Sequence, residues 1–234
     1  MSRVLVVLPT FNERDSLAQV VAGVRTLDYE VLVVDDRSPD GTGEIAAELA
    51  AQDPGVAVMH RPRKLGLGSA YLAGFKLGLE RGYDFLVEMD SDGSHRIEHL
   101  DAIVAASARV GGLAIGSRYI PGGGVSGWPW HRSLLSAGAN AYCRLLLGWS
   151  VRDATSGYRC YSSAALVAVG LDRVRSSGYE FQVEMVYRCL EQGVAVCEIP
   201  IRFEDRTSGR SKVSRSEVMK GLAGVLRLAA QRWR

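Results

Sequence analysis

The sequence predicts an α/β protein built on a central, mostly parallel sheet. Its first hundred residues alternate short apolar runs with stretches of helical spacing, and polar residues follow the apolar runs directly. Uninterrupted apolar strands are typical of a parallel sheet that helices cover on both faces. With right-handed crossovers between successive strands, this alternation gives a Rossmann-like α/β/α sandwich.

The first expected elements are strands at 4–8 and 31–34, two runs of valine and leucine that end at Pro9 and at Asp35-Asp36. A helix over 12–27 lies between them, because its leucine and valines recur at helical spacing. The elements that follow are a helix over 40–49, a strand at 56–59, a helix over 68–80 and a strand at 85–89.

The second half of the chain has a less regular pattern. A helix over 101–110 and a strand at 112–116 lead into a loop, 117–130, that is rich in glycine, proline and tryptophan. No internal repeat or low-complexity linker divides the chain, so we expect one catalytic domain over 1–215 and a basic amphipathic helix over 216–234. The other expected elements are a helix over 132–147, a polar turn at 153–158, helices over 164–169 and 181–192, a strand at 194–200 and a helix over 216–233.

Composition and charge exclude several classes of protein. Apolar residues make up 47% of the 234 residues, which suffices for one substantial core. The net charge of +2 gives the chain as a whole no electrostatic reason to bind nucleic acid. The charge is uneven, however, because residues 200–234 carry nine basic and three acidic side chains.

The four cysteines lack the spacing of metal ligands, and a chain of this size does not need disulfides, so we expect them to be reduced. The N-terminus shows no apolar segment followed by a small-residue cleavage site, which predicts no signal peptide. No stretch approaches the roughly 18 uninterrupted apolar residues of a membrane span. We therefore expect a soluble protein that can lie on a membrane surface.

Acidic residues follow three of the expected strands, and the pair Asp90 and Asp92 is the most informative. A single acid in such a place often caps the next helix. Two carboxylates one residue apart repel each other at the end of a buried strand, unless a proton or a cation lies between them. A hard divalent metal, which also binds phosphate oxygens, resolves the conflict. His95 is then either a further ligand or a helix-capping side chain.

A metal with few protein ligands keeps positions open for a diphosphate, which favours an activated nucleotide as substrate. The first strand is not followed by G-x-G-x-x-G, and no G-x-x-x-x-G-K-[ST] occurs, so neither dinucleotide redox chemistry nor P-loop hydrolysis is indicated. The segment Gly66-Leu67-Gly68 resembles a phosphate loop only weakly, and we interpret it as tight packing at a helix start.

Nine segments in order resemble the GT-A glycosyltransferases of family 2, and within them the dolichol- or polyprenol-phosphate mannose synthases. The resemblance covers residues 4 to about 215. The segments are Pro9-Thr10-Phe11-Asn12-Glu13-Arg14, 34–42, 61–68, Glu88-Met89-Asp90-Ser91-Asp92-Gly93-Ser94-His95, Gly116-Ser117-Arg118-Tyr119, Trp130-His131-Arg132, 153–159, 178–181 and 206–212.

The resemblance implies a GDP-mannose donor, a divalent metal (Mg²⁺ or Mn²⁺) and a polyprenyl or dolichyl phosphate acceptor at the cytoplasmic face of the membrane. Phe11 stands where many relatives have tyrosine. Ser94 stands where some have a metal-binding glutamine, which leaves the third protein ligand open. Carried over by position, the guanosine site would be Pro9, Phe11, Glu13, Val34 and Asp36, and the metal and diphosphate would be held by Asp90, Ser91 and Asp92.

Basic residues complete this expected site. Arg118, Arg206 and Lys212 would meet donor or acceptor phosphate, and Arg132 would position the acceptor. The alternative for the residues near 206–212 is a solvated charged loop. A phosphate monoester is already mostly a dianion at neutral pH, so the reaction needs no general base, and in-line attack predicts inversion at the sugar. Asp90 is then a metal ligand and not a base.

Two amphipathic segments could meet the lipid tail. Residues 128–149 are apolar and rimmed by tryptophan, and residues 216–233 place apolar side chains roughly on one face, with basic ones elsewhere. Both could instead pack on the core. Many relatives append membrane spans after this point, so we expect this chain to dock peripherally or to use a membrane-anchoring partner subunit.

Two other functions remain open on the sequence. The nearest is a polyprenyl-phosphate glucosyltransferase, or another hexosyltransferase, with a UDP-sugar as donor. The other is a sugar-nucleotide-binding scaffold subunit without activity. The intact Asp90, Asp92, Arg118 and Arg206 argue against the scaffold.

Overall fold

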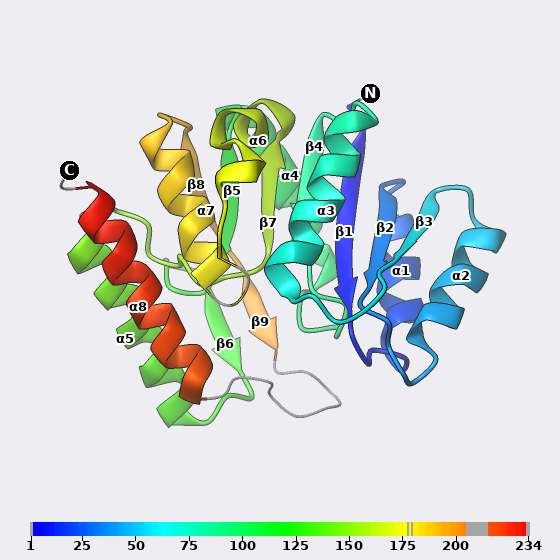
Figure 1. Ribbon diagram of the computed structural model, residues 1–234, viewed down its shortest axis with the longest axis horizontal. Helices are drawn as coiled ribbons and strands as arrows, with labels where there is room; N and C mark the ends of the chain where they lie inside the picture. The colour runs from blue at the N-terminus through cyan, green and yellow to red at the C-terminus, as the bar shows by residue number, and fades with distance from the viewer. Residues whose placement is uncertain (1, 177, 179, 205–214, 233–234) are drawn as a thin grey trace.

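The computed structural model describes residues 2–176, 178, 180–204 and 215–232, with no side chains for 215–220 and 232. These residues form a central sheet with helices on both faces (Figure 1). The strand order is β3-β2-β1-β4-β7-β5-β8. The strands are β1 (Val4–Thr10), β2 (Glu30–Asp35), β3 (Val56–His60), β4 (Phe85–Glu88), β5 (Leu113–Ser117), β7 (Arg159–Ser162) and β8 (Val196–Pro200).

The helices divide between two apolar cores, one on each face of the sheet. Alternate side chains of β1 show this, because Val6 and Leu8 point into one core and Leu5 and Val7 into the other. The first core is covered by α1 (Leu17–Arg25), α2 (Thr42–Gln52) and α4 (Leu100–Val110). The second is covered by α3 (Leu67–Glu80), α5 (Trp130–Leu147), α6 (Ser163–Val169), α7 (Glu180–Glu191) and α8 (Arg215–Arg232). The predicted α/β/α class is confirmed.

Helix α3 approaches its neighbours closely at the glycines of its buried face. A Cβ placed on Gly74 would lie 2.5 Å from a methyl carbon of Val7 on β1. At the start of the same helix, a Cβ on Gly68 would lie 2.9 Å from the ring of Phe181 on α7. The glycines at this helix start therefore permit tight packing, as the sequence predicts.

One strand of the sheet is absent from the sequence prediction. β7 runs antiparallel between β4 and β5, whereas the sequence predicts a polar turn leading directly to a helix. The strand has only four residues and begins with Arg159, whose side chain is fully buried. Because arginine is typical of exposed positions, a short segment that begins with it is not predicted as a buried strand, and the sequence analysis therefore misses β7.

The carboxyl ends of the parallel strands meet at the lower edge of the sheet in Figure 1, where ligands bind in open α/β sheets. A second small sheet lies near this edge and pairs β6 (Gly124–Ser126) with β9 (Arg202–Glu204). Both strands are three residues long, too short for the sequence to predict. They connect the loop after β5 with the segment after β8.

Helix α8 packs against both α5 and α7. Its Val225, Leu228 and Ala229 are buried in the second core, so the C-terminal helix is part of the body of the protein (Figure 1). Among the described residues, no helix combines the length and the apolar character that crossing a bilayer requires. The four cysteines are free thiols, as predicted.

Candidate active site

The loop before α3 is held in place by Asp36. This carboxylate is almost fully buried, forms an ion pair with Arg61, and accepts hydrogen bonds from the backbone N–H groups of Leu65 and Gly66, each at 3.1 Å. Its position directly after β2 brings the segment 61–66 against the carboxyl end of the sheet. Asp36, which the sequence analysis expects in the guanosine site, thus fixes the loop before α3 by binding its backbone.

The other residues expected at guanosine lie around the ends of β1 and β2. Phe11 is half-buried, with the Lys64 Nζ 3.9 Å from its ring centroid. Glu13 donates its backbone N–H to the Thr42 hydroxyl at 3.0 Å. Pro9 is half-buried in β1, while the Val34 side chain is fully buried in the core below. Phe11 therefore lies at this end of the sheet with the Lys64 ammonium beside its ring.

Asp90, Ser91 and Asp92 form a tight turn directly after β4. The Ser91 hydroxyl donates to the carbonyl oxygen of Pro9 at 2.9 Å, which ties the turn to β1. Asp92 is buried and accepts the Ser94 N–H at 3.0 Å. The Asp90 side chain is 33% exposed and accepts a hydrogen bond from the Tyr71 hydroxyl at 3.2 Å. Asp90 thus faces the surface from a fixed position.

His95 supports the Asp90 turn and caps no helix. Its Nδ1 accepts the Asp90 backbone N–H at 2.9 Å, and its ring stacks on Tyr158 with centroids 4.7 Å apart. Burial lowers the pKa of His95 and outweighs the nearby carboxylates, which act to raise it. A neutral imidazole whose Nδ1 accepts this N–H carries its proton on Nε2, which lies 3.9 Å from the Asp90 Oδ2.

The residues at this turn suit a divalent cation. Burial raises the pKa of Tyr71, and the neighbouring carboxyl groups of Asp90, Glu88 and Asp92 raise it further. Among the described residues, no three acidic, histidine or cysteine side chains cluster as metal ligands. Asp90 and Asp92 are the two side chains of this turn that could hold a cation, whose remaining ligands would be oxygens of a diphosphate and water.

A buried polar group lies beneath the turn. Glu88 is fully buried, and burial raises its pKa to about 7, although Arg159 opposes this rise from the paired position on β7. Arg159 donates to the carbonyl oxygens of Ser156, Gln182 and Ala154, each at 2.7 Å. The arginine thereby joins β4, the loop before β7 and the start of α7.

Arg118, which follows β5, is bound along one edge to Asp153. Its Nε and Nη2 donate to the two carboxylate oxygens at 2.8 Å and 2.7 Å, and Nη2 also donates to the Thr155 hydroxyl at 2.8 Å. Burial by itself would raise the pKa of Asp153, but the Arg118 guanidinium holds this pKa below its ordinary value. These contacts use Nε and Nη2, and among the described residues none accepts a hydrogen bond from Nη1.

Two arginines converge on one tryptophan ring. The Arg132 guanidinium lies 4.1 Å and that of Arg118 5.4 Å from the ring centroid of Trp128. Phe203 of β9 meets the Trp128 ring at 5.4 Å and the His95 ring at 5.7 Å, edge to face. Aromatic rings thus connect the arginines to the side chains of the Asp90 turn. Arg206 and Lys212 lie outside the described residues.

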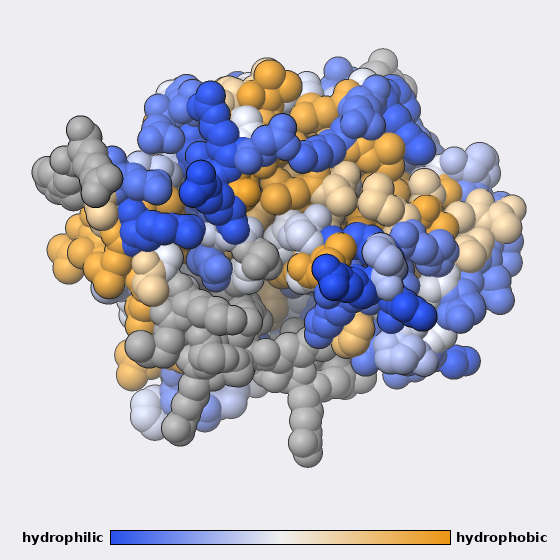
Figure 2. Space-filling model, viewed as in Figure 1, coloured by the Kyte–Doolittle hydropathy of each residue, from blue (hydrophilic) through white to orange (hydrophobic). Residues whose placement is uncertain are grey.

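The outer surface of α5 is apolar. Trp130 is 78% exposed and Leu145 81%, and Leu134 and Leu135 are also exposed. Figure 2 shows apolar residues gathered at the left edge of the molecule, over α5. We call these four side chains the α5 apolar face. It belongs to the same helix as Arg132.

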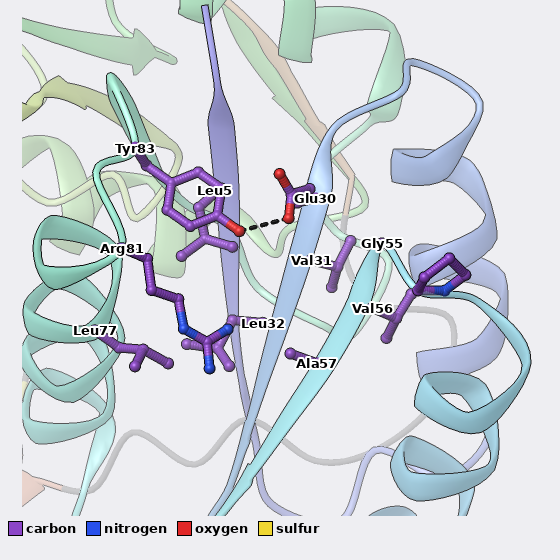
Figure 3. A pocket seen from close by; sticks show the side chains of 11 residues that line it. Leu5, Glu30, Val31, Leu32, Gly55, Val56, Ala57, Leu77, Arg81 and Tyr83 are labelled. Atoms are coloured by element: carbon purple, nitrogen blue, oxygen red, sulfur yellow. Dashed lines mark hydrogen bonds between the residues drawn. The ribbon is translucent and has the colours of Figure 1, made fainter.

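A small cavity lies at the opposite end of the strands, near the start of β2 and β3 (Figure 3). Its lining is mostly aliphatic. The Tyr83 hydroxyl donates to the Glu30 carboxylate at 2.6 Å, and Arg3 pairs with the same carboxylate at 3.2 Å. These polar groups satisfy one another, and the cavity is remote from the residues predicted to act.

Several side chains of this site are absent from the sequence prediction. Tyr71, Asp153, Thr155 and Phe203 carry no separate motif, and Asn140 lies inside a helix that the sequence presents as amphipathic. Asp153 and Thr155 fall in one of the nine segments, so a search for a partner of Arg118 could have found them. The contacts of the other side chains depend on tertiary packing.

The chain is similar to known proteins over most of its length. Residues 5–170 match the family model described as glycosyl transferase family 2. The chain is 50% identical over 226 residues to polyprenol monophosphomannose synthase of Mycolicibacterium smegmatis, with coverage of 95% of this chain and 85% of the relative. It is 47% identical over 234 residues to undecaprenyl-phosphate mannosyltransferase of Micrococcus luteus, with coverage of 99% and 96%.

A solved structure resembles the fold at low sequence identity. The mannosyltransferase PcManGT from Pyrobaculum calidifontis, in complex with GDP-Man and Mn²⁺, superposes with a TM-score of 0.58 and 15% identity. The match covers 98% of this chain and 73% of that one.

Proposed function

This chain belongs to glycosyl transferase family 2 and is a polyprenol-phosphate mannosyltransferase, and on that premise we propose that it transfers mannose from GDP-mannose to a polyprenyl phosphate with inversion at the sugar. One observation carries the proposal. Two arginines share the Trp128 ring beside a turn of acidic residues, so an anionic acceptor and a metal-bound diphosphate can be held next to each other.

The donor side of the proposal uses the residues at the ends of β1, β2 and β4. Phe11 would stack on guanine, while the segment fixed by Asp36 forms the wall of the site. Asp90 and Asp92 would hold a divalent cation, which supplies positive charge against the leaving diphosphate. A mannosyltransferase of the same fold is known with GDP-Man and Mn²⁺, which supports this choice of donor and metal.

The acceptor side uses the arginines. A phosphate monoester with a second pKa of about 6 is mostly a dianion at neutral pH, so no residue has to remove a proton from it. Its oxygen attacks the anomeric carbon, the bond from that carbon to the diphosphate breaks, and the α-linked donor gives a β-linked product. Arg132 and the Nη1 of Arg118 would hold the dianion against its repulsion from the donor.

The function is tested by identifying the product. Purified protein is incubated with labelled GDP-mannose, Mn²⁺ and a short-chain polyprenyl phosphate, with UDP-glucose as the competing donor. We expect a β-linked mannosyl phospholipid, with no product in excess chelator. A preference for UDP-glucose would show that GDP-mannose is not the donor, and turnover in excess chelator would show that the reaction needs no metal. Absence of any glycosyl lipid in all arms would favour the inactive scaffold.

We also propose that the α5 apolar face lies on the cytoplasmic surface of the membrane that carries the acceptor. A water-soluble acceptor phosphate would need no such surface, but a polyprenyl chain must remain in lipid while its headgroup reaches Arg132. Side chains as exposed as Leu145 on one helix face are suited to insertion at a bilayer interface.

Replacing Leu134 and Leu145 together by glutamate should weaken binding to vesicles at least about a hundredfold, because two inserted leucines contribute roughly 3–6 kcal/mol. Sedimentation with phosphatidylglycerol-containing vesicles measures this. The control is Val167→Glu, which places a charge on a comparably exposed apolar residue of α6. Transfer to a short, soluble acceptor should stay within about twofold in both variants, since neither touches the site. Equal vesicle binding by wild type and the double variant would assign the lipid contact to another surface.

A further inference from the structure

Helix α5 has a polar residue on its buried side. Among its described residues the buried ones are Asn140, Cys143 and Leu147. Cys143 and Leu147 pack in the apolar core, whereas Asn140, 2% exposed, carries a side-chain amide. A buried amide is costly unless its polar atoms are hydrogen-bonded.

Two of the three hydrogen bonds of this amide are to the segment that holds Arg118. The Asn140 Oδ1 accepts the backbone N–H of Ala154 at 2.8 Å. Its Nδ2 donates to the Thr155 hydroxyl at 3.0 Å and to the Ser136 carbonyl oxygen at 3.1 Å. The Asn140 oxygen and both N–H groups of its amide are therefore hydrogen-bonded. If Oδ1 and Nδ2 exchanged places, the NH₂ group would face the Ala154 N–H, which is also a donor.

The Thr155 hydroxyl connects Asn140 to Arg118. It accepts one hydrogen bond from Asn140 and one from the Arg118 Nη2, at 2.8 Å. A hydroxyl has one hydrogen and two lone pairs. With both lone pairs used, its hydrogen is directed to the Asp153 Oδ1, 3.2 Å away, which in turn binds Arg118. The orientation of the ion pair thus depends on a donor from α5.

We propose that Asn140 is a positioning residue, through which α5 fixes the Arg118–Asp153 pair so that the Arg118 Nη1 faces the acceptor phosphate. The inference rests on the proposed function, because it takes the ligand of Nη1 to be a phosphate monoester. The same helix carries the α5 apolar face on its other side. The side-chain amide of Asn140 thereby links the helix that would contact lipid, α5, to the orientation of Arg118.

The test is Asn140→Asp. The carboxylate keeps an acceptor for the Ala154 N–H, but it cannot donate to Thr155, and it adds a negative charge near Asp153. We expect the kcat/KM for polyprenyl phosphate to fall roughly tenfold to a hundredfold, the range for loss of a hydrogen bond next to a charged group. The KM for GDP-mannose should stay within about twofold, because the donor residues are not touched. The matched control is Gln192→Glu, which also converts a side-chain amide to a carboxylate but at an exposed residue directly after α7.

Thr155 supplies the second test. Thr155→Val removes the hydroxyl, whereas Thr155→Ser keeps it, so serine should restore most of the acceptor kcat/KM that valine loses. Asn140→Asp added to Thr155→Val should cost much less than it costs alone, since the two act through one hydroxyl. Additive losses, or a loss of donor and acceptor use in equal measure, would overturn the proposal.

Binding of short-chain polyprenyl phosphate, measured by calorimetry, separates this inference from the function. If the wild type binds the phosphate but transfers no sugar, the proposed function fails while the positioning role is still measured by the weaker binding of Asn140→Asp. If the wild type and Asn140→Asp bind it equally well, Asn140 does not position Arg118.

Discussion

Replacing Asp92 by asparagine is expected to abolish sugar transfer while leaving the protein folded. The amide oxygen can still accept the Ser94 N–H, so the turn after β4 keeps its internal hydrogen bond. What is lost is one of two carboxylate charges that a divalent cation would use. We expect kcat to fall at least about a thousandfold, because a metal at a leaving phosphate contributes several kcal/mol to the transition state.

A measurement of nucleotide binding accompanies this prediction. Thermal melting with GDP should show a Mn²⁺-dependent stabilisation in the wild type and none in Asp92→Asn, since the cation links the nucleotide to the protein. Asp84→Asn is the matched control, because Asp84 lies just before the other end of β4, where it accepts the Arg3 N–H at 2.7 Å. Turnover by Asp92→Asn near the wild-type rate would remove the metal from our account.

The sequence predicts the parts of the fold whose pattern is local. Strands β1 to β4 and helices α1 to α3 each direct an apolar run or stripe to the core, which in β3 and α2 is only partly buried. All of them lie where the sequence places them, with shifts at their ends. The helix expected over 12–27 begins only at Leu17, because Asn12 adopts a positive φ of 61° and Glu13 is followed by a turn. Such turns depend on side chains of neighbouring loops.

The site is only partly predictable for the same reason. Asp90 and Asp92 stand out because two acids one residue apart at the end of a buried strand repel each other unless a cation or a proton lies between them. The segment 153–159 offers a carboxylate, but the sequence does not show that it occupies the Nε and Nη2 of Arg118, since Asp153 lies 35 residues further on. Phe203 likewise reaches His95 only because β9 pairs with β6. Partners that are distant in the chain require the tertiary structure.

The Arg118–Asp153 pair leads to the second large expected effect. In Arg118→Met the carboxylate of Asp153, 0% exposed, loses its counter-charge, and an unpaired buried charge costs about 3–5 kcal/mol. For a chain of this length, that corresponds to a fall in Tm of roughly 6–20 °C. Transfer should also fall at least about a hundredfold, because Arg132 alone then holds the acceptor phosphate.

A double variant separates these two losses. Asp153→Asn added to Arg118→Met removes the buried charge, and its amide oxygen can still accept the backbone N–H of residue 118, which Asp153 accepts at 2.9 Å. We expect most of the lost Tm to return and the transfer rate to stay at least about a hundredfold below wild type, as for loss of a preorganised donor. If the double variant regained both stability and activity, Arg118 would act only as a counter-ion for Asp153. Because stability and turnover are then predicted to move apart, the pair of measurements tells whether this arginine meets the acceptor or merely holds its loop.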